Sequence, residues 1–197
     1  MDSNPHEIYI KNFNINLLEC KYLGKGNNGI VYLLPDRKVI KICYAVDSCK
    51  KEYNILHRIK HSRYFPRVYG MTGNYMIRDY VEGEILKNYI KHNGLSRELS
   101  LKIMDLLDEF KKLKFSKNDI RCKDIIVKPD GELMIIDPKK FYSKKRDYPR
   151  HLCKGLYKLN VLDIFLNTLK EKKPKEYNKW NHKIISYITL KENQGDL

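Results

Sequence analysis

The feature that most constrains this chain is a cluster of glycines between segments of strand-forming residues. Three glycines and a valine fit the pattern G-x-G-x-x-G-x-V: Gly24, Gly26, Gly29 and Val31. Segments rich in β-branched and aromatic residues predict three strands around them, at 17–23, 29–34 and 38–44. A dinucleotide-binding Rossmann unit would instead need a helix directly after the glycines. The sequence therefore predicts a glycine-rich hairpin followed by a third strand.

The other patterns divide the chain into a sheet-rich first part and a helical second part. Apolar spacing predicts a helix over 49–60, with Asp47 or Ser48 as its cap. Ser96 is expected to cap a long amphipathic helix over 97–115. Further elements are expected as strands at 67–70 and 75–81, a hairpin at 124–137, and helices around 159–169 and 180–188.

These patterns predict the α+β class. We expect an N-terminal antiparallel β-sheet lobe with one helix over residues 1–82. A reduced, mainly helical C-terminal lobe that carries the hairpin would follow over residues 83–197. The two lobes would form a single domain with a cleft where they join.

Lys41 stands among apolar residues in the segment VIKI. A buried ammonium is costly unless it is paired, and phosphate oxygens together with one helical carboxylate would satisfy it. Glu52 is the candidate carboxylate, eleven residues further along the chain. The alternative is a solvent-facing lysine on an edge strand.

A second cluster holds three aspartates around one short hairpin: Asp119, Asp124 and Asp137. If these carboxylates converge, their mutual repulsion calls for a cation, and oxygen ligands suit Mg²⁺ with phosphate. The alternative is three surface aspartates at turns, as expected for Asp130 in the PDG turn.

Taken together and in this order, the motifs resemble the protein kinase superfamily over about residues 17–142. The resemblance is to a small atypical bacterial form, which is similar to the RIO and Bud32-like kinases in its reduced size. It implies that the glycine hairpin covers the phosphates of ATP, and that Lys41 holds the α- and β-phosphates and pairs with Glu52. It implies that Asp119 orients the acceptor hydroxyl and takes its proton, with Arg121 near the γ-phosphate. Asp124 and Asp137 would then bind Mg²⁺ or Mn²⁺.

The resemblance also implies that the lobe over residues 1–82 binds a nucleotide and that the chain has an adenosine site. The backbone at Asp79–Val81 would bind the adenine, and Glu84 would reach the ribose. Four apolar side chains would enclose the adenine ring: Leu23, Val31, Val39 and Ile126.

Several positions depart from the kinase pattern. DPK stands in place of D-F-G, KND in place of H-R-D, and no A-P-E motif follows. Asp124 replaces an asparagine, and Arg78 stands where the gatekeeper is normally apolar. The main reading is transfer of the γ-phosphoryl group of Mg-ATP to a protein serine or threonine, with autophosphorylation as one form. The alternatives are a pseudokinase that acts as a nucleotide-binding or scaffolding module, and a small-molecule kinase.

Composition bears on partners and location. The net charge of +15 favours anionic partners, but the lysines are scattered, so nucleic acid is not the favoured partner. Five cysteines without a CxxC pair argue against a zinc site or a disulfide framework and for a reducing compartment. No segment has membrane-spanning length, and the N-terminus lacks a signal pattern. We therefore expect a cytoplasmic protein whose protein substrate the sequence leaves open.

Overall fold

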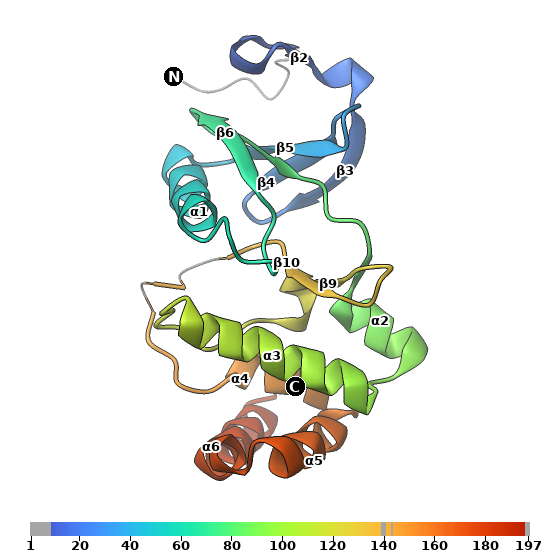
Figure 1. The fold of residues 1–197 in the computed structure, drawn as a ribbon, viewed down its shortest axis with the longest axis vertical. Helices are drawn as coiled ribbons and strands as arrows, with labels where there is room; N and C mark the ends of the chain where they lie inside the picture. The colour runs from blue at the N-terminus through green and yellow to red at the C-terminus, as the bar shows by residue number, and fades with distance from the viewer. Residues whose placement is uncertain (1–8, 139–140, 143, 196–197) are drawn as a thin grey trace. The chain divides into compact units, whose positions relative to one another are not determined.

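The computed structural model describes residues 9–138, 141–142 and 144–195 and shows a mixed α/β fold with antiparallel sheets (Figure 1). The chain divides into two compact units, Met1–Tyr80 and Val81–Leu197. This division falls two residues before the lobe boundary expected from the sequence, which stays a prediction. Each unit is described by itself below.

The first unit is built on a five-stranded antiparallel sheet with the order β3-β4-β5-β7-β6. Its strands are β3 (Lys21–Gly26), β4 (Gly29–Leu33), β5 (Lys38–Cys43), β6 (Val68–Thr72) and β7 (Tyr75–Asp79). In the β3–β4 hairpin Gly26 pairs with Gly29, so the glycine pattern forms a hairpin, as the sequence predicts. The first strand begins later than expected, because Leu17–Glu19 form a 3-10 turn. Asn16 caps this turn and accepts a hydrogen bond from the Leu18 backbone N–H at 3.1 Å.

Helix α1 (Val46–Arg58) contacts β5, β6 and β7. Both predicted caps, Asp47 and Ser48, are wrong, because the helix begins at Val46, ahead of either residue, and its N-cap is Ala45. Asp47 instead lies in the first turn, where a negative charge interacts favourably with the helix dipole.

An N-terminal hairpin that the sequence analysis did not predict supplies a second layer. Strands β1 (Tyr9–Ile10) and β2 (Ile15–Asn16) pair with each other, with a 3-10 turn (Lys11–Phe13) between them. Ile10 forms a buried cluster with Leu34 and Ile40 of the region around β4 and β5. Because side chains alternate along β5, Ile40 faces this cluster while its neighbours face the other side of the sheet. Strand β5 is therefore covered on both faces, which explains its nearly continuous burial.

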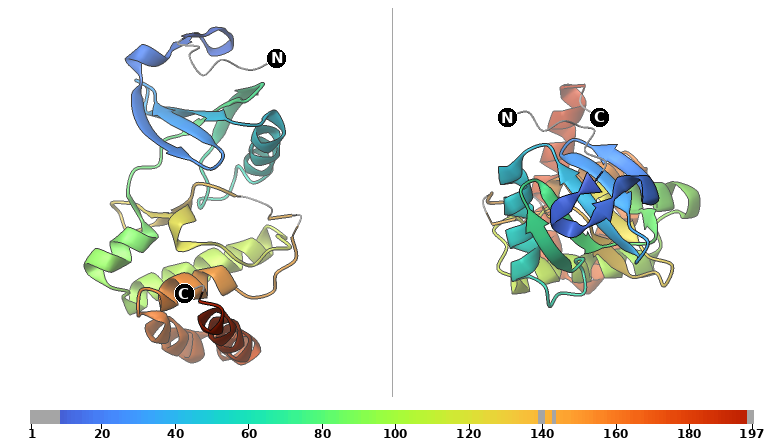
Figure 2. Two further views of the ribbon diagram at one scale, coloured as in Figure 1. Left: turned by 180° about the vertical axis from the view of Figure 1, so that it is seen from behind. Right: turned by 90° about the horizontal axis from the view of Figure 1, so that it is seen from above.

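The second unit combines helices with a three-stranded antiparallel sheet of order β10-β9-β8. Its helices are drawn in green to red in Figure 2. The strands are β8 (Glu84–Ile85), β9 (Ile125–Val127) and β10 (Leu133–Ile135). The helices are α2 (Leu86–Asn93), α3 (Arg97–Lys112), α4 (Arg150–Tyr157), α5 (Leu162–Lys172) and α6 (Pro174–Asn193). A short 3-10 turn, Cys122–Asp124, leads into β9.

Helix α3 begins as predicted, with the Ser96 Oγ accepting a hydrogen bond from the Leu99 backbone N–H at 3.0 Å. It packs on α5, and α5 packs on α6. Phe110 of α3 meets Phe115 and Phe141, with ring centroids 4.7 to 5.4 Å apart within this cluster. Trp180, the sole tryptophan, is buried in α6. These contacts form the core of the second unit.

All five cysteines are free thiols, and four of them are buried: Cys43, Cys49, Cys122 and Cys153. Among the residues that the structure describes, no helix combines the length and the apolar character needed to cross a membrane.

Candidate functional site

The glycine hairpin contains glycines of two kinds. Gly29 has φ +152°, and a Cβ atom there would lie 2.1 Å from the Ile42 carbonyl oxygen, so packing against β5 requires a glycine. Gly26 has an ordinary backbone conformation, and no described atom lies within 4 Å of where its Cβ would be. Neither its conformation nor its neighbours explain this glycine. A bare backbone of this kind is typical of a position that a ligand approaches closely.

Behind the hairpin, Lys41 of β5 and Glu52 of α1 form a buried ion pair. The Lys41 Nζ donates to the Glu52 Oε2 at 2.5 Å, and only 7% and 4% of the two residues is exposed. The Glu52 Oε1 is also buried and has no hydrogen-bond partner among the described residues. The pair expected from the sequence is thus present, and the alternative of a solvent-facing lysine on an edge strand is wrong. The contact of Lys41 with phosphate stays a prediction.

The residues expected to enclose an adenine ring are divided between the two units. Val31 is paired with Lys41, and Val39 lies two positions earlier on β5, so these side chains share one face of the sheet. Val39 is buried, Val31 is half-buried and Leu23 is 38% exposed. Ile126 is buried in β9 of the second unit. Enclosure of one ring by all four stays a prediction.

The expected adenine-binding backbone begins at a heavily bonded residue, Asp79. Its backbone N–H donates to the Arg67 carbonyl at 2.9 Å, and its carboxylate accepts from the Arg67 N–H at 2.9 Å and from the Tyr69 hydroxyl at 2.6 Å. The hydrogen bond to this carboxylate raises the pKa of Tyr69. The buried Arg78 also donates to the Asp79 carbonyl, at 3.1 Å. Because the N–H and the carboxylate of Asp79 are already bonded, its contact with adenine would use the second lone pair of its carbonyl oxygen. The backbone N–H of Val81 is then the expected donor to the adenine.

Glu84, the residue expected to reach the ribose, lies in β8 at the start of the second unit. Its Oε1 is 2.9 Å from Nδ1 of His92, which lies in the last turn of α2. Both side chains are partly exposed, so this contact leaves Glu84 accessible to solvent. Its role toward a ribose stays a prediction.

Asp119 differs most from its expected setting. The kinase resemblance implies that this carboxylate orients the acceptor hydroxyl and takes its proton, a role that needs direct contact with substrate, but Asp119 is fully buried. Its Oδ1 accepts a hydrogen bond from the His151 backbone N–H at 2.9 Å, and its Oδ2 contacts the His151 Nδ1. His151 lies in the first turn of α4, and 35% of its side chain is exposed. The group that this pair presents to solvent is the imidazole, and the carboxylate lies behind it.

Arg121 and Asp124 form a two-pronged ion pair. The Arg121 Nε and Nη2 donate to the two Asp124 oxygens at 2.6 and 3.0 Å. The hydrogen bond to Asp124 raises the pKa of Arg121, and the charges of Asp137 and Asp119 add to the effect. Arg121 is thus held among the three aspartates expected to converge.

The carboxylates expected to bind a metal lie on adjoining backbone. The Ile136 N–H, next to Asp137, donates to the Asp124 carbonyl at 3.1 Å. Within the described residues, no three His, Cys, Asp or Glu side chains gather as metal ligands. Mg²⁺ commonly uses one or two carboxylates and completes its shell with phosphate and water, so Asp124 and Asp137 fit such an ion if Arg121 releases Asp124. Lys139 of the DPK motif lies outside the described residues.

Sequence reasoning missed two residues near Asp119. His151 follows Asp119 by 32 positions and stands in no motif, so only the folded chain brings it there. Lys117 lies just before Asp119; burial lowers its pKa, and the charges of Asp119 and Asp124 partly oppose this. A basic residue two positions before a candidate catalytic aspartate was the signal available for Lys117.

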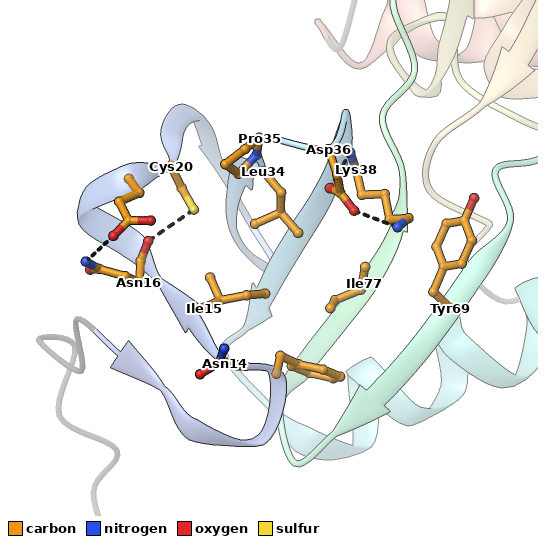
Figure 3. Close-up of a pocket in the computed structure, with 12 residues that line it drawn as sticks. Asn14, Ile15, Asn16, Cys20, Leu34, Pro35, Asp36, Lys38, Tyr69 and Ile77 are labelled. Carbon is orange, nitrogen blue, oxygen red and sulfur yellow. Dashed lines mark hydrogen bonds and ion pairs between the residues drawn. The ribbon is translucent and has the colours of Figure 1, made fainter.

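A separate pocket of about 340 Å³ lies in the first unit, between the N-terminal hairpin and the sheet (Figure 3). Ile15, Leu34 and Ile77 supply its apolar wall, and the Asp36–Lys38 pair stands at its rim. None of the site residues expected from the sequence lines it. It is therefore a different feature from the predicted nucleotide site.

Comparison with known proteins gives one informative sequence match. No family model matches the chain. A Bacillus subtilis (strain 168) protein named "Putative serine/threonine-protein kinase YrzF" is 22% identical over 133 residues, which are 64% of this chain and 62% of that protein. The match supports a protein kinase-like fold. The matched residues span less than two thirds of this relative's length. The similarity to RIO and Bud32-like kinases stays a prediction.

One solved structure is similar in part. A crystal structure of Rad53 1–466 in complex with AMP-PNP aligns with a TM-score of 0.47 and 19% identity. The alignment covers 64% of this chain and 38% of the Rad53 chain.

Proposed function

We propose that this chain is a phosphotransferase that moves the γ-phosphoryl group of Mg-ATP to a serine or threonine hydroxyl of a protein, autophosphorylation included. The observation that carries the proposal is the buried Lys41–Glu52 pair behind a hairpin whose Gly26 is bare. A buried ion pair contributes little stability, so its presence calls for a further reason. One such reason is that Glu52 positions the Lys41 ammonium so that it can bind phosphate oxygens.

The acceptor hydroxyl needs a group that takes its proton. Asp119 is fully buried and bonded to His151, so the proton would pass to His151, whose side chain is 35% exposed, at the ring nitrogen Nε2. Asp119 would hold the ring through Nδ1 and stabilise the imidazolium that forms. Arg121, which pairs with Asp124 in the absence of ligand, would release it and stabilise negative charge on the transferred group. Asp124 and Asp137 would hold a divalent ion, which supplies charge neutralisation on the phosphates when it is bound.

The first test is binding of nucleotide. A ligand present at 100 times its Kd adds about 2.7 kcal/mol of stability, which corresponds to roughly 5–10 °C in Tm for a chain of this size. We expect Mg-ATP to produce such a shift and Lys41→Ala to remove most of it. Lys38→Ala is the matched control, because Lys38 lies on the same strand but pairs with the exposed Asp36. An unchanged Tm at millimolar Mg-ATP would rule out the proposal.

The second test is transfer. Incubation with γ-labelled ATP and Mg²⁺ or Mn²⁺, followed by mass mapping, should find phosphate on a serine or threonine. The buried, fully bonded Asp119 favours one other candidate, a pseudokinase that binds nucleotide without transferring phosphate. A Tm shift with no labelled product would select that candidate.

A further inference from the structure

A cationic pocket lies in the second unit, in the segment before α4. It encloses about 480 Å³ and is lined by Lys145, Arg146, Asp147, Tyr148 and Arg150. None of these residues was a predicted site residue. Three of the five side chains are cations, and their charge is the first indication of what the pocket can hold.

The one acidic side chain of the pocket is already neutralised from outside. Asp147 accepts a hydrogen bond from the Lys183 Nζ of α6 at 2.5 Å, and this bond lowers the pKa of the Asp147 carboxyl. Within the described part of the chain, no carboxylate lies within ion-pair distance of Lys145, Arg146 or Arg150. The pocket therefore presents three cations and no available negative charge.

The arginines of the pocket have unused donors. The Nε atoms of Arg146 and Arg150 are buried without a hydrogen-bond partner among the described residues. A buried donor without a partner is costly, and these two atoms are themselves closed to solvent. An anion in the pocket would interact with the guanidinium charge of both arginines, which is spread over all three nitrogens of each group. The Arg150 guanidinium also lies 5.3 Å from the Tyr187 ring centroid, a contact that orients it.

The pocket is joined on both sides to the loop that carries Asp119. The Asn118 N–H donates to the Arg146 carbonyl at 2.7 Å. On the other side, Arg150 directly precedes His151, whose N–H and ring bind the Asp119 carboxylate. An anion in the pocket would therefore be held close to the proposed proton acceptor, His151.

Resting on the proposed function, we propose that this pocket binds a carboxylate or phosphate group of the acceptor polypeptide, close in sequence to the hydroxyl that receives the phosphoryl group. The substrate class is then a protein segment with acidic or already phosphorylated residues beside its serine or threonine. A peptide fits better than RNA, because the three cations converge on a single pocket while the other lysines of the chain are scattered.

Binding of short fluorescent peptides, measured by anisotropy without ATP, tests the proposal independently of catalysis. The peptides carry one serine flanked by glutamate, phosphoserine or glutamine, and the first two distinguish a carboxylate from a phosphate source. We expect one or both anionic peptides to bind at least about tenfold more tightly than the glutamine peptide. Added salt should weaken this preference.

Pocket variants localise the binding. Lys145→Gln with Arg146→Gln, and separately Arg150→Gln, should each weaken binding of the anionic peptides about tenfold. Lys158→Gln is the matched control, because Lys158 is an exposed lysine at the end of α4, outside the pocket. Circular dichroism of each variant verifies that it is folded. Equal binding of the three peptides would overturn the proposal, and so would a Lys158→Gln variant that weakens binding as much as the pocket variants do. The proposal would also be overturned if the anionic peptides did not bind and the protein bound RNA in a way that the pocket variants abolish.

The two proposals can fail separately. Pocket-dependent binding of anionic peptides without any transfer of labelled phosphate would keep this inference and remove the proposed function. Transfer of labelled phosphate with no preference for acidic or phosphorylated residues beside the acceptor would keep the proposed function and remove this inference.

Discussion

Lys41 shows why a single residue in this chain has consequences for both stability and function. Its ammonium is buried, and among the described residues it donates a hydrogen bond to one oxygen of Glu52, whose other oxygen has no partner there. Removal of one member of such a pair leaves an uncompensated buried charge, whereas removal of both does not. The pair can therefore be tested for a structural contribution separately from its proposed contact with phosphate.

We expect Lys41→Met to lower the free energy of unfolding by about 3–5 kcal/mol, because it leaves the Glu52 carboxylate buried and unpaired. The double variant Lys41→Met/Glu52→Leu should recover most of this loss. Urea denaturation followed by circular dichroism measures both effects. Additive losses in the double variant would contradict the prediction.

His151 is the second residue with a testable role. If its ring takes the acceptor proton, His151→Ala should lower kcat about 10²–10⁴-fold with little change in the KM for ATP, and added imidazole should restore part of the rate. His182→Ala, at an exposed histidine of α6, is the control. A faster His151→Ala enzyme would instead mean that His151 only blocks Asp119.

At the scale of elements, helix α4 lies unusually close to the loop that carries Asp119 and Asp124. A Cβ at Gly155 would lie 2.6 Å from the Sγ of Cys122, in the 3-10 turn before β9. Cys122 is itself buried, and this burial raises the pKa of its thiol to about 12. The helix that supplies His151 can approach the loop this closely only because residue 155 has no side chain.

We therefore expect Gly155→Ala to destabilise the second unit by about 1–3 kcal/mol through overpacking, although alanine is the better helix former. Cys122→Ala should make room, so Gly155→Ala in that background should be neutral or stabilising. The fluorescence of Trp180, which is buried in the same unit, follows unfolding in urea. An equal loss in both backgrounds would show that the contact with Cys122 is not the cause.

Asp108 connects α3 to the junction of α5 and α6. It accepts hydrogen bonds from Lys111 at 2.9 Å and from Lys173. Burial acts to raise the pKa of this carboxyl, but the hydrogen bonds and charges of the two lysines outweigh it, and the pKa is lowered. A carboxyl whose pKa is lower in the folded state adds stability above its unfolded pKa of about 3.9, and this stability is lost as the pH falls through the folded value.

Asp108→Asn should consequently cost about 1 kcal/mol at neutral pH, since the group is partly exposed and the pair is screened by solvent. The difference from the unaltered chain should vanish in acid, once the carboxyl is protonated in both states. Urea titrations at neutral and acidic pH, read from Trp180, measure it. Glu98→Gln, at an exposed position of the same helix, should show little effect at either pH.

Elements whose formation depends on neighbouring residues could be predicted from the sequence, whereas features that depend on contacts between distant residues could not. The Ser96 cap and the glycine hairpin follow from neighbouring residues, and both are present. Helix α4 was missed because it is short and contains Gly155. The burial of Asp119 could not be predicted, because it depends on His151, which lies 32 positions further along the chain.

At the scale of the whole molecule, charge is the dominant property. A net charge of +15 on 197 residues produces self-repulsion, which opposes compactness. The lysines are spread over both units, so we expect this cost to be general and not confined to one site.

Raising NaCl from low to high concentration should therefore raise the Tm, because screening weakens repulsion between the many exposed cations. Differential scanning fluorimetry with the same protein in a NaCl series measures the trend. A Tm that falls or stays constant would indicate that the exposed ion pairs, which salt also weakens, outweigh the repulsion.

The buried cysteines can report on local opening of each unit without any introduced labelling site. Cys43 and Cys49 belong to the first unit, and Cys122 and Cys153 to the second. A thiol in the core reacts with an alkylating reagent only when its surroundings open. Mass spectrometry of the time course of alkylation at each pair would then yield a separate opening free energy for each half of the unaltered protein, with and without nucleotide.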